Sequence, residues 1–258
     1  MFLAAAAACM PSAAQTLQVW VHSGPGPERD AYVASVQAFG GDLIERARRR
    51  RAEGVINGSG SVAALRTLQA WVRAGYVDAA PKNDHAFVSG QSAISWVGHW
   101  VYGHYKKALG DKLGLVPLPR FSSRTVTGSG SWNFGIAASC PHPEAAGRFI
   151  EHLMSRIEIL RVTQVNGAVP GTGAAMVFSR HYAPDGELRL YAEQLLAGMA
   201  RVRPPTPHYP VVSRAFAEAV SQVARGADVQ QALDRAARTI ESHIAATDAA
   251  NHTTGKTP

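Results

Sequence analysis

The strongest constraint on the fold is the spacing of apolar residues, which alternates along the chain between the period of a strand and the period of a helix. Residues 16–21 (TLQVWV) alternate as a strand does, and after a Gly-Pro-Gly-Pro turn the apolar residues up to Phe39 recur at helical spacing. Further strands are predicted at 93–97, 113–119 and 132–138, with a helical segment between the first two of them and further helices along the rest of the chain. Strands that alternate with helices pack as a mainly parallel sheet flanked by helices, so we expect an α/β fold.

The clearest predicted helix runs from Ser61, as its N-cap, to Arg73, and Gly75 ends it. Other segments carry weaker helix or loop signals. Helices are predicted at 101–109, from Pro143, at 157–165, at 188–196 and from Ser213 and Asp228, polar or proline-rich loops at 120–131 and 201–210, and a disordered tail after Thr247.

The chain has a moderate basic excess that is partly local. Among its 258 residues, Lys and Arg number 26 against 19 Asp and Glu, which gives a formal charge of +7. Five of the positive charges lie in one run, at Arg46 and 48–51. No aromatic residues interleave with this run, so we expect a solvated surface there and no nucleic-acid partner.

The N-terminus resembles an export signal. Residues 1–15 (MFLAAAAACMPSAAQ) are apolar and then small, with a plausible cleavage neighbourhood at Ala13-Ala14-Gln15 but no basic start. Cys9 matches a lipidation site poorly, and without this segment Cys140 is the one cysteine left. The segment therefore predicts an exported, periplasmic or extracytoplasmic protein with no intrachain disulfide.

No catalytic or metal-binding pattern stands out. The chain lacks G-x-S-x-G, the phosphate-loop motif and H-E-x-x-H, and His99 and His104 are five residues apart rather than four. No tight carboxylate pair offers general acid and base chemistry. We therefore expect a protein that is not an enzyme and that has no catalytic residues, no metal and no cofactor.

Aromatic and polar residues gather where predicted strands give way to loops. Aromatic faces pack against sugar rings, while serine, histidine and arginine side chains fix the hydroxyls. For Arg203 the sequence leaves a surface charge and a ligand donor both open. The candidate ligand-binding residues are His22, Ser23, Trp100, Trp132, Arg203 and Tyr209.

Six segments, in the same order, resemble the family 1 extracellular solute-binding proteins, the sugar receptors of ABC importers. They are LQVWVHSGPGPERDAYVASVQAF, GGDLIERARRRRAEGVINGSGSVAALRTLQAWVRAGYVD, AFVSGQSAISWVGHW, GSWNFGIAASCPHPEAAGRFIEHLMS, NGAVPGTGAA and RPPTPHYP. The resemblance covers Thr16 to about Ile244 and implies a clamshell of two α/β lobes that close around a ligand.

The resemblance also implies an internal gap. Such receptors carry most of their N-terminal lobe between the first helix and the Gly-Gly-Asp segment, on the order of 100 residues on ordinary domain sizes. Here Phe39 runs directly into Gly40. The implied organisation is a signal-like segment (1–15), a remnant of the truncated N-terminal lobe (16–39), the inter-lobe segment and C-terminal lobe (40–247), and a tail (248–258).

By resemblance, the expected function is capture of a sugar or sugar-phosphate-like ligand and its delivery to a membrane permease, by a monomer. His22 and Ser23 would come from the remnant, and the other four candidate residues from the retained lobe. One alternative is an internally deleted, non-binding remnant of such a receptor. An α/β carbohydrate-active enzyme is a further alternative, which predicts an acid and base pair that the sequence does not convincingly offer.

Overall fold

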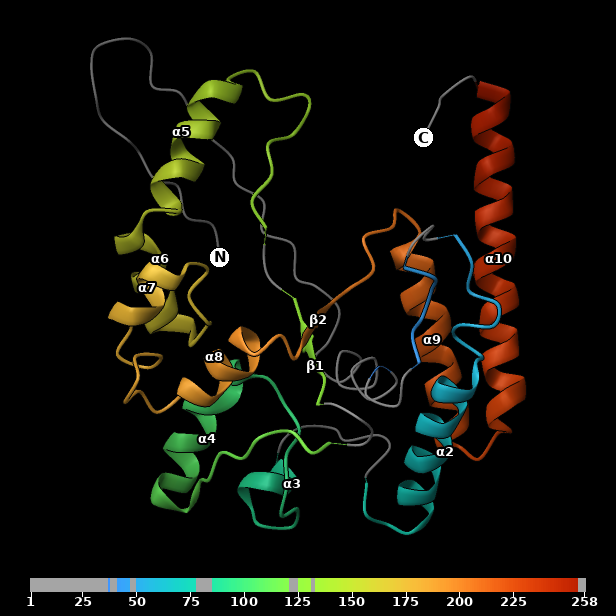
Figure 1. Cartoon of the computed structure of the whole chain (residues 1–258), viewed down its shortest axis with the longest axis horizontal. Coiled ribbons are helices and arrows are strands. Elements are labelled where there is room, and N and C mark those ends of the chain that lie inside the picture. Colours follow the sequence, from blue (N-terminus) through green and yellow to red (C-terminus); the bar gives the residue numbers. More distant parts are fainter. Residues whose placement is uncertain are drawn as a thin grey trace. The chain divides into compact units, whose positions relative to one another are not determined.

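The computed structural model describes residues 37, 41–46, 50–77, 85–120, 125–130 and 133–254. They fall into two compact units: unit 1 holds the described residues of 133–189, and unit 2 those of 37–130 and 190–254. Helices dominate both units, and the described strands form one parallel pair (Figure 1). None of the helices in these ranges is long and apolar enough to cross a bilayer.

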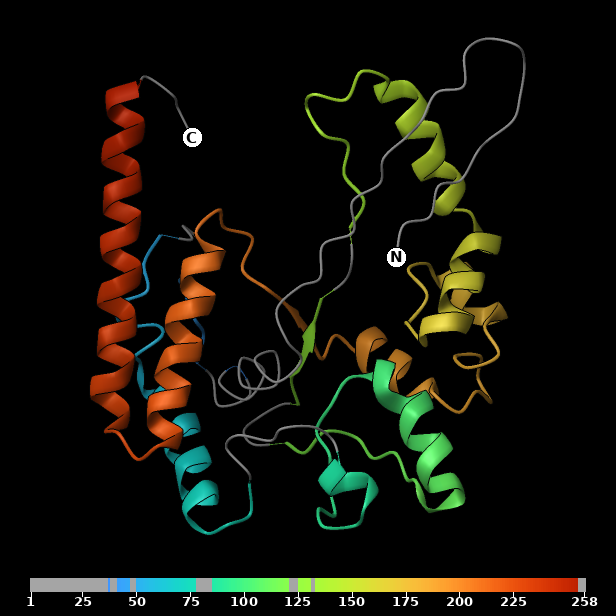
Figure 2. The ribbon, with the colours of Figure 1, turned by 180° about the vertical axis from the view of Figure 1, so that it is seen from behind.

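Three helices of unit 2 lie side by side (Figures 1 and 2): α2 (Ser59–Arg73), α9 (Tyr209–Ala224) and α10 (Val229–Thr254). The sequence predicts all three, but the N-cap of α2 is Gly58 rather than Ser61. Ser61 lies inside the helix, and its hydroxyl donates instead to a loop carbonyl.

The core of unit 2 lies between these helices. Phe216 of α9 and Leu233 and Ile240 of α10 are fully buried, and Leu65 of α2 is almost so. Leu233 and Ile240 lie on one stripe of α10 because they are seven residues apart. Burying a side chain of this size stabilises the fold by roughly 1.5–3 kcal/mol.

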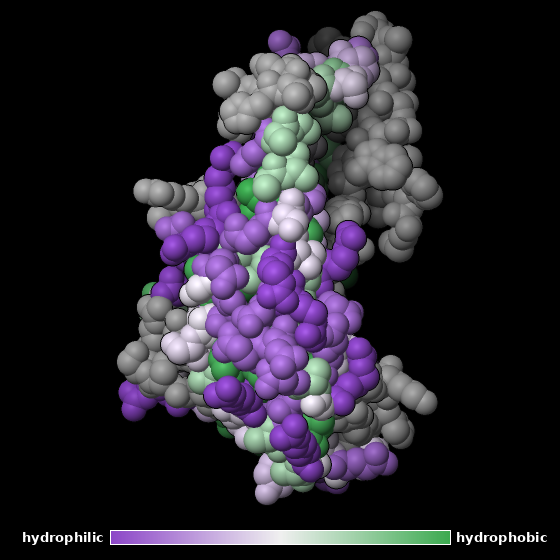
Figure 3. Space-filling model, turned by 90° about the vertical axis from the view of Figure 1, so that its right-hand side faces the viewer, coloured by the Kyte–Doolittle hydropathy of each residue, from purple (hydrophilic) through white to green (hydrophobic). Residues whose placement is uncertain are grey.

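α10 extends beyond Thr247, where the sequence predicts a disordered tail. The helix continues to Thr254. Alanines at 245, 246, 249 and 250 favour this extension because alanine has the highest helix propensity. Figure 3 looks onto the outer side of the molecule that carries α10, where hydrophilic residues prevail, as expected for a helix with one buried stripe.

Three acids on one face of α10 hold residues 50–57, the segment that leads into α2, against α10. Asp234, Glu241 and Asp248 are spaced by seven residues, which places them in one row along the helix. The contacts are Asn57 Nδ2 to Asp234 (2.8 Å), the Ala52 and Glu53 N–H groups to Glu241 Oε1 (2.6 and 3.0 Å), and Arg50 to Asp248 (3.1 Å).

In the part of the arginine run that the structure describes, Arg46 and Arg50 pair with acids, while Arg51 is exposed as the sequence predicts. Arg46 forms an ion pair with Asp42 at 2.5 Å, and Arg50 forms one with Asp248. Arg46 and Arg50 can reach these acids because residues on either side of them, Leu43 and Ala52, are buried in the core.

The described sheet is a parallel pair, β1 (Thr127–Ser129) and β2 (Ala200–Val202), in which Ser129 is the partner of Val202. β1 lies within the stretch 120–131, which the sequence predicts to be a loop. Its Thr-Gly-Ser composition is typical of turns, but ladder hydrogen bonds are made by the backbone and tolerate it.

Other predicted strands do not form ladders. Residues 93–97, 113–119 and 133–138 have no strand assignment in the structure, and residues 16–21 lie outside the described ranges. Ile94 is 80% exposed and Val116 is 76% exposed. The apolar runs identify chain suited to a sheet, but a strand also needs a neighbour in register, which the pattern does not specify.

Unit 1 contains α5 (Pro143–Leu153), α6 (Arg156–Asn166) and α7 (Gly173–Phe178). The sequence predicts the first two. Ser155 caps α6 by accepting from the Glu158 N–H, and α6 ends at a glycine with φ of +67°. These caps lie one residue outside each end of α6, and the predicted helix at 157–165 falls within one residue of both bounds.

The remaining elements are short: α3 (His85–Val88), η1 (His99–Val101), α4 (Tyr102–Leu109), η2 (Gly110–Lys112) and α8 (Arg189–Leu196). The predicted division into leader, remnant, retained lobe and tail remains a prediction. Its first two segments lie outside the described residues except for Gln37.

Candidate ligand-binding site

The parallel pair brings two loops to the same edge of the sheet. Ser129 and Val202 are partners, so the residues that follow them, Gly130 and Arg203, leave the carboxyl edge together. A Cβ added at Gly130 would lie 3.5 Å from Nη2 of Arg203, so the guanidinium lies against a residue without a side chain. Ligands of open α/β sheets bind at this edge, which makes Arg203 a candidate ligand donor.

Arg203 also lies over an aromatic ring. Its Cζ is 5.9 Å from the ring centroid of Tyr209, within the range of a cation–π contact. The sequence predicts that Tyr209 lies in a loop, but in the structure it is the first residue of α9, and Pro210 fits the first turn. A guanidinium carries five N–H donors, so this pair combines donors with an aromatic face.

Trp100 lies in a second aromatic group, built on η1. The residue is 50% exposed, so half of its surface is accessible to solvent. A Cβ added at Gly98 would overlap the Trp100 ring, so the glycine permits the ring to fold back onto the chain. The His99 ring contacts Trp100 edge to face at 5.3 Å and Tyr191 of α8 at 5.9 Å.

Tyr191 contributes a neutral hydroxyl to this second group. Burial raises the pKa of Tyr191 above its ordinary value because the phenolate is poorly solvated there. The hydroxyl therefore stays protonated at neutral pH and keeps its donor capacity.

A buried histidine, His208, lies between Arg203 and Tyr209 in the chain and is the N-cap of α9. His208 packs edge to face on His243 with ring centroids 5.7 Å apart. Burial lowers the pKa of His208, the neighbouring His243 and Arg50 lower it further, and Asp248 opposes them. His208 is accordingly neutral at neutral pH.

The structure thus brings Arg203 and Tyr209 together and places Trp100 with His99 and Tyr191. His22, Ser23 and Trp132 lie outside the described residues. They remain predicted ligand residues.

Sequence reasoning did not find Gly130, His99 or Tyr191 as parts of these groups. Gly130 had a signal, since it belongs to the glycine-rich stretch TGSGS before Trp132. Tyr191 had none, because only the fold brings α8 to η1. Across the described ranges, no group of three His, Cys, Asp or Glu residues could hold a metal ion.

Three solved binding proteins have a similar fold at 21–22% sequence identity. An ABC transporter solute-binding protein from Thermotoga lettingae TMO, bound with α-D-tagatose, is 21% identical with a TM-score of 0.70, covering 84% of this chain and 56% of that one. The cyclic α-maltosyl-1,6-maltose binding protein from Arthrobacter globiformis is 22% identical with a TM-score of 0.66, covering 84% and 55%. A cyclo/maltodextrin-binding protein complexed with maltotetraose is 21% identical with a TM-score of 0.68, covering 84% and 57%.

The fold is therefore that of a periplasmic-binding-protein-like lobe, as the sequence predicts. The chain spans only 55–57% of the length of these proteins. A coverage of this size agrees with a truncated N-terminal lobe, while the position of the gap at Phe39 and Gly40 remains a prediction.

Residues 2–175 match the family described as bacterial extracellular solute-binding protein. The match takes in more than half of the chain, and the protein belongs to that family. Comparison with curated proteins gave no significant match.

Proposed function

We propose that the protein is the substrate-binding component of an ABC-type importer that captures a sugar or sugar derivative and delivers it to a membrane permease. The family and the fold support a binding protein. The observation that carries the proposal is Arg203, held over Tyr209 at the carboxyl edge of the parallel pair. Its N–H donors suit sugar hydroxyls or a phosphate group, and the Tyr209 ring supports the guanidinium from one side.

In this proposal the protein acts as an exported, non-enzymatic monomer without cofactor, metal or nucleic-acid partner. Trp100 supplies a second aromatic face, and His22, Ser23 and Trp132 remain predicted ligand residues. A phosphorylated polyol such as glycerol phosphate is included in the ligand class because the formal charge is +7 and Arg203 carries a guanidinium group.

The second candidate function is that of a non-binding remnant. It is favoured by the 56% coverage of a solved receptor and by exposed apolar side chains, Ile94 and Val116 among them, in segments predicted to pair in a sheet. A receptor that closes around its ligand uses two lobes, so loss of one lobe would weaken binding.

A thermal-shift series on the purified full chain separates the two functions. The probes are maltotetraose, tagatose and glycerol 3-phosphate, and the variants are Arg203→Ala and Tyr209→Ala. Arg225→Ala is the matched control, since Arg225 is exposed and its contacts are within α9. The proposal expects a saturable rise in melting temperature with one probe class, lost in both site variants and kept in the control. A cooperative melt that no probe shifts would instead support the remnant.

A further inference from the structure

We propose that Arg46 is a positioning residue for this site: it holds the end of β2 so that Arg203 stays over Tyr209. The inference rests on the proposed function for its ligand, but its structural part concerns residues of this chain alone. Neither Arg46 nor its partner Asp42 is among the residues that the sequence singles out for binding.

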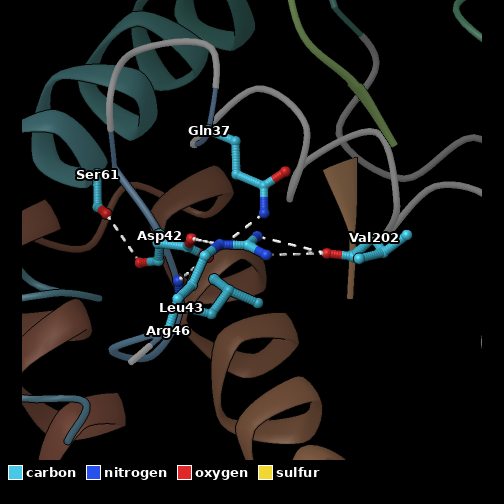
Figure 4. A network of polar contacts seen from close by, with 6 residues as sticks. All are labelled: Gln37, Asp42, Leu43, Arg46, Ser61 and Val202. Carbon is cyan, nitrogen blue, oxygen red and sulfur yellow. Dashed lines mark hydrogen bonds and ion pairs between the residues drawn. The ribbon is translucent and has the colours of Figure 1, made fainter. Parts of the chain in front are cut away.

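The first step is the contact between Arg46 and β2. Nη1 and Nη2 of Arg46 both donate to the Val202 carbonyl, at 3.3 and 3.4 Å (Figure 4). That carbonyl belongs to the planar peptide unit that joins Val202 to Arg203. Fixing the carbonyl therefore fixes the plane from which Arg203 begins.

The second step is the anchor of Arg46. Its Nε donates to Asp42 Oδ2 at 2.5 Å, which orients the guanidinium toward β2 (Figure 4). Asp42 is itself held, because its Oδ1 accepts from the Leu43 N–H at 2.9 Å and from Gln37 Nε2 at 3.3 Å. Leu43 is fully buried in the core, so the network ties β2 to the core.

The third step compares the effect of this network on global stability with its effect on the geometry of the site. The Arg46 and Asp42 side chains are 33% and 19% exposed, and partly exposed ion pairs of this kind contribute little to global stability. The position of the Val202 carbonyl, by contrast, depends directly on the two donors. Arg46 is therefore expected to act on the site more than on stability. A lysine, with one ammonium, reproduces the charge but not the fork of donors.

The test compares Arg46→Ala and Arg46→Lys with the parent and with the control Arg225→Ala. Amide hydrogen exchange is followed in peptides that cover residues 200–208, and affinity is measured by calorimetry with maltotetraose and glycerol 3-phosphate. Losing donors of a charged group should raise exchange in these peptides about tenfold in Arg46→Ala and less in Arg46→Lys. Affinity for the bound probe should fall by a similar factor, with urea midpoints nearly unchanged.

A double-mutant cycle with Arg203→Ala shows whether Arg46 affects ligand affinity through Arg203. If Arg46 acts through Arg203, Arg46→Ala should lower affinity little further in the Arg203→Ala background. Equal losses in both backgrounds, or unchanged exchange in 200–208, would overturn the positioning role. If neither probe binds the parent, the proposed function fails for these ligands, and the exchange result alone decides the role of Arg46.

Discussion

Glu241 offers a sharp test of how the segment before α2 is held. Its Oε1 accepts from the N–H groups of Ala52 and Glu53, at 2.6 and 3.0 Å, in the middle of the acidic row on α10. Ala52 is fully buried, whereas Glu53 is exposed. We expect Glu241→Ala to destabilise unit 2 because the Ala52 N–H loses its partner away from water.

The magnitude follows from that difference in burial. A buried donor left unsatisfied costs about 1–3 kcal/mol, while water replaces the lost partner of the exposed Glu53 N–H at little cost. Glu241→Ala should therefore lower the free energy of unfolding by about 1.5–3 kcal/mol. Glu241→Gln keeps an acceptor oxygen and should cost about 1 kcal/mol or less, because it removes only the charge assistance.

Urea denaturation followed by circular dichroism at 222 nm measures both variants. Glu218→Ala on α9 is the matched control, since Glu218 is exposed and accepts from Gln222 of the same helix. Its effect should stay within about 0.5 kcal/mol. If Glu241→Ala were no more destabilising than Glu218→Ala, the acidic row would not hold this segment.

Three further outcomes are expected. Phe216→Ala should lower the free energy of unfolding by about 3–5 kcal/mol and Phe216→Leu by less than about 1.5 kcal/mol, in the same denaturation assay. Because the folded-state pKa of His208 is lowered, the parent should lose stability as pH falls below about 6.5, and His208→Gln should flatten that slope in melts between pH 5 and 8. Gly98→Ala should displace the Trp100 ring, seen as a changed tryptophan emission spectrum; an unchanged spectrum would contradict the close approach.

Local signals made much of the helical structure predictable. The apolar stripe from Val62 to Val72 predicts α2 within two residues of its observed bounds. The predicted helix at 157–165 lies within one residue of α6, whose ends the structure places next to Ser155 and Gly167. The sheet was less predictable because strand pairing depends on distant partners. The Thr-Gly-Ser residues of β1 form a ladder, while the more apolar 93–97 does not.

The candidate site likewise has one part that the sequence predicts and another part that only the fold reveals. Arg203 and Tyr209 could be selected from the sequence because a proline-rich stretch placed a donor and an aromatic ring near each other. The contact of Arg203 with Gly130, and its link through Val202 to Arg46, could not be predicted from the sequence. Arg46 and Val202, for example, are 156 residues apart in the chain. Only the fold brings such residues together.

Calorimetric titration of the purified full chain with maltotetraose, tagatose and glycerol 3-phosphate tests the central claim most directly. The account predicts saturable heat with one of these ligand classes and its loss in Arg203→Ala. A folded parent chain that gives no saturable heat with any of them would contradict the proposed receptor function and support the non-binding remnant.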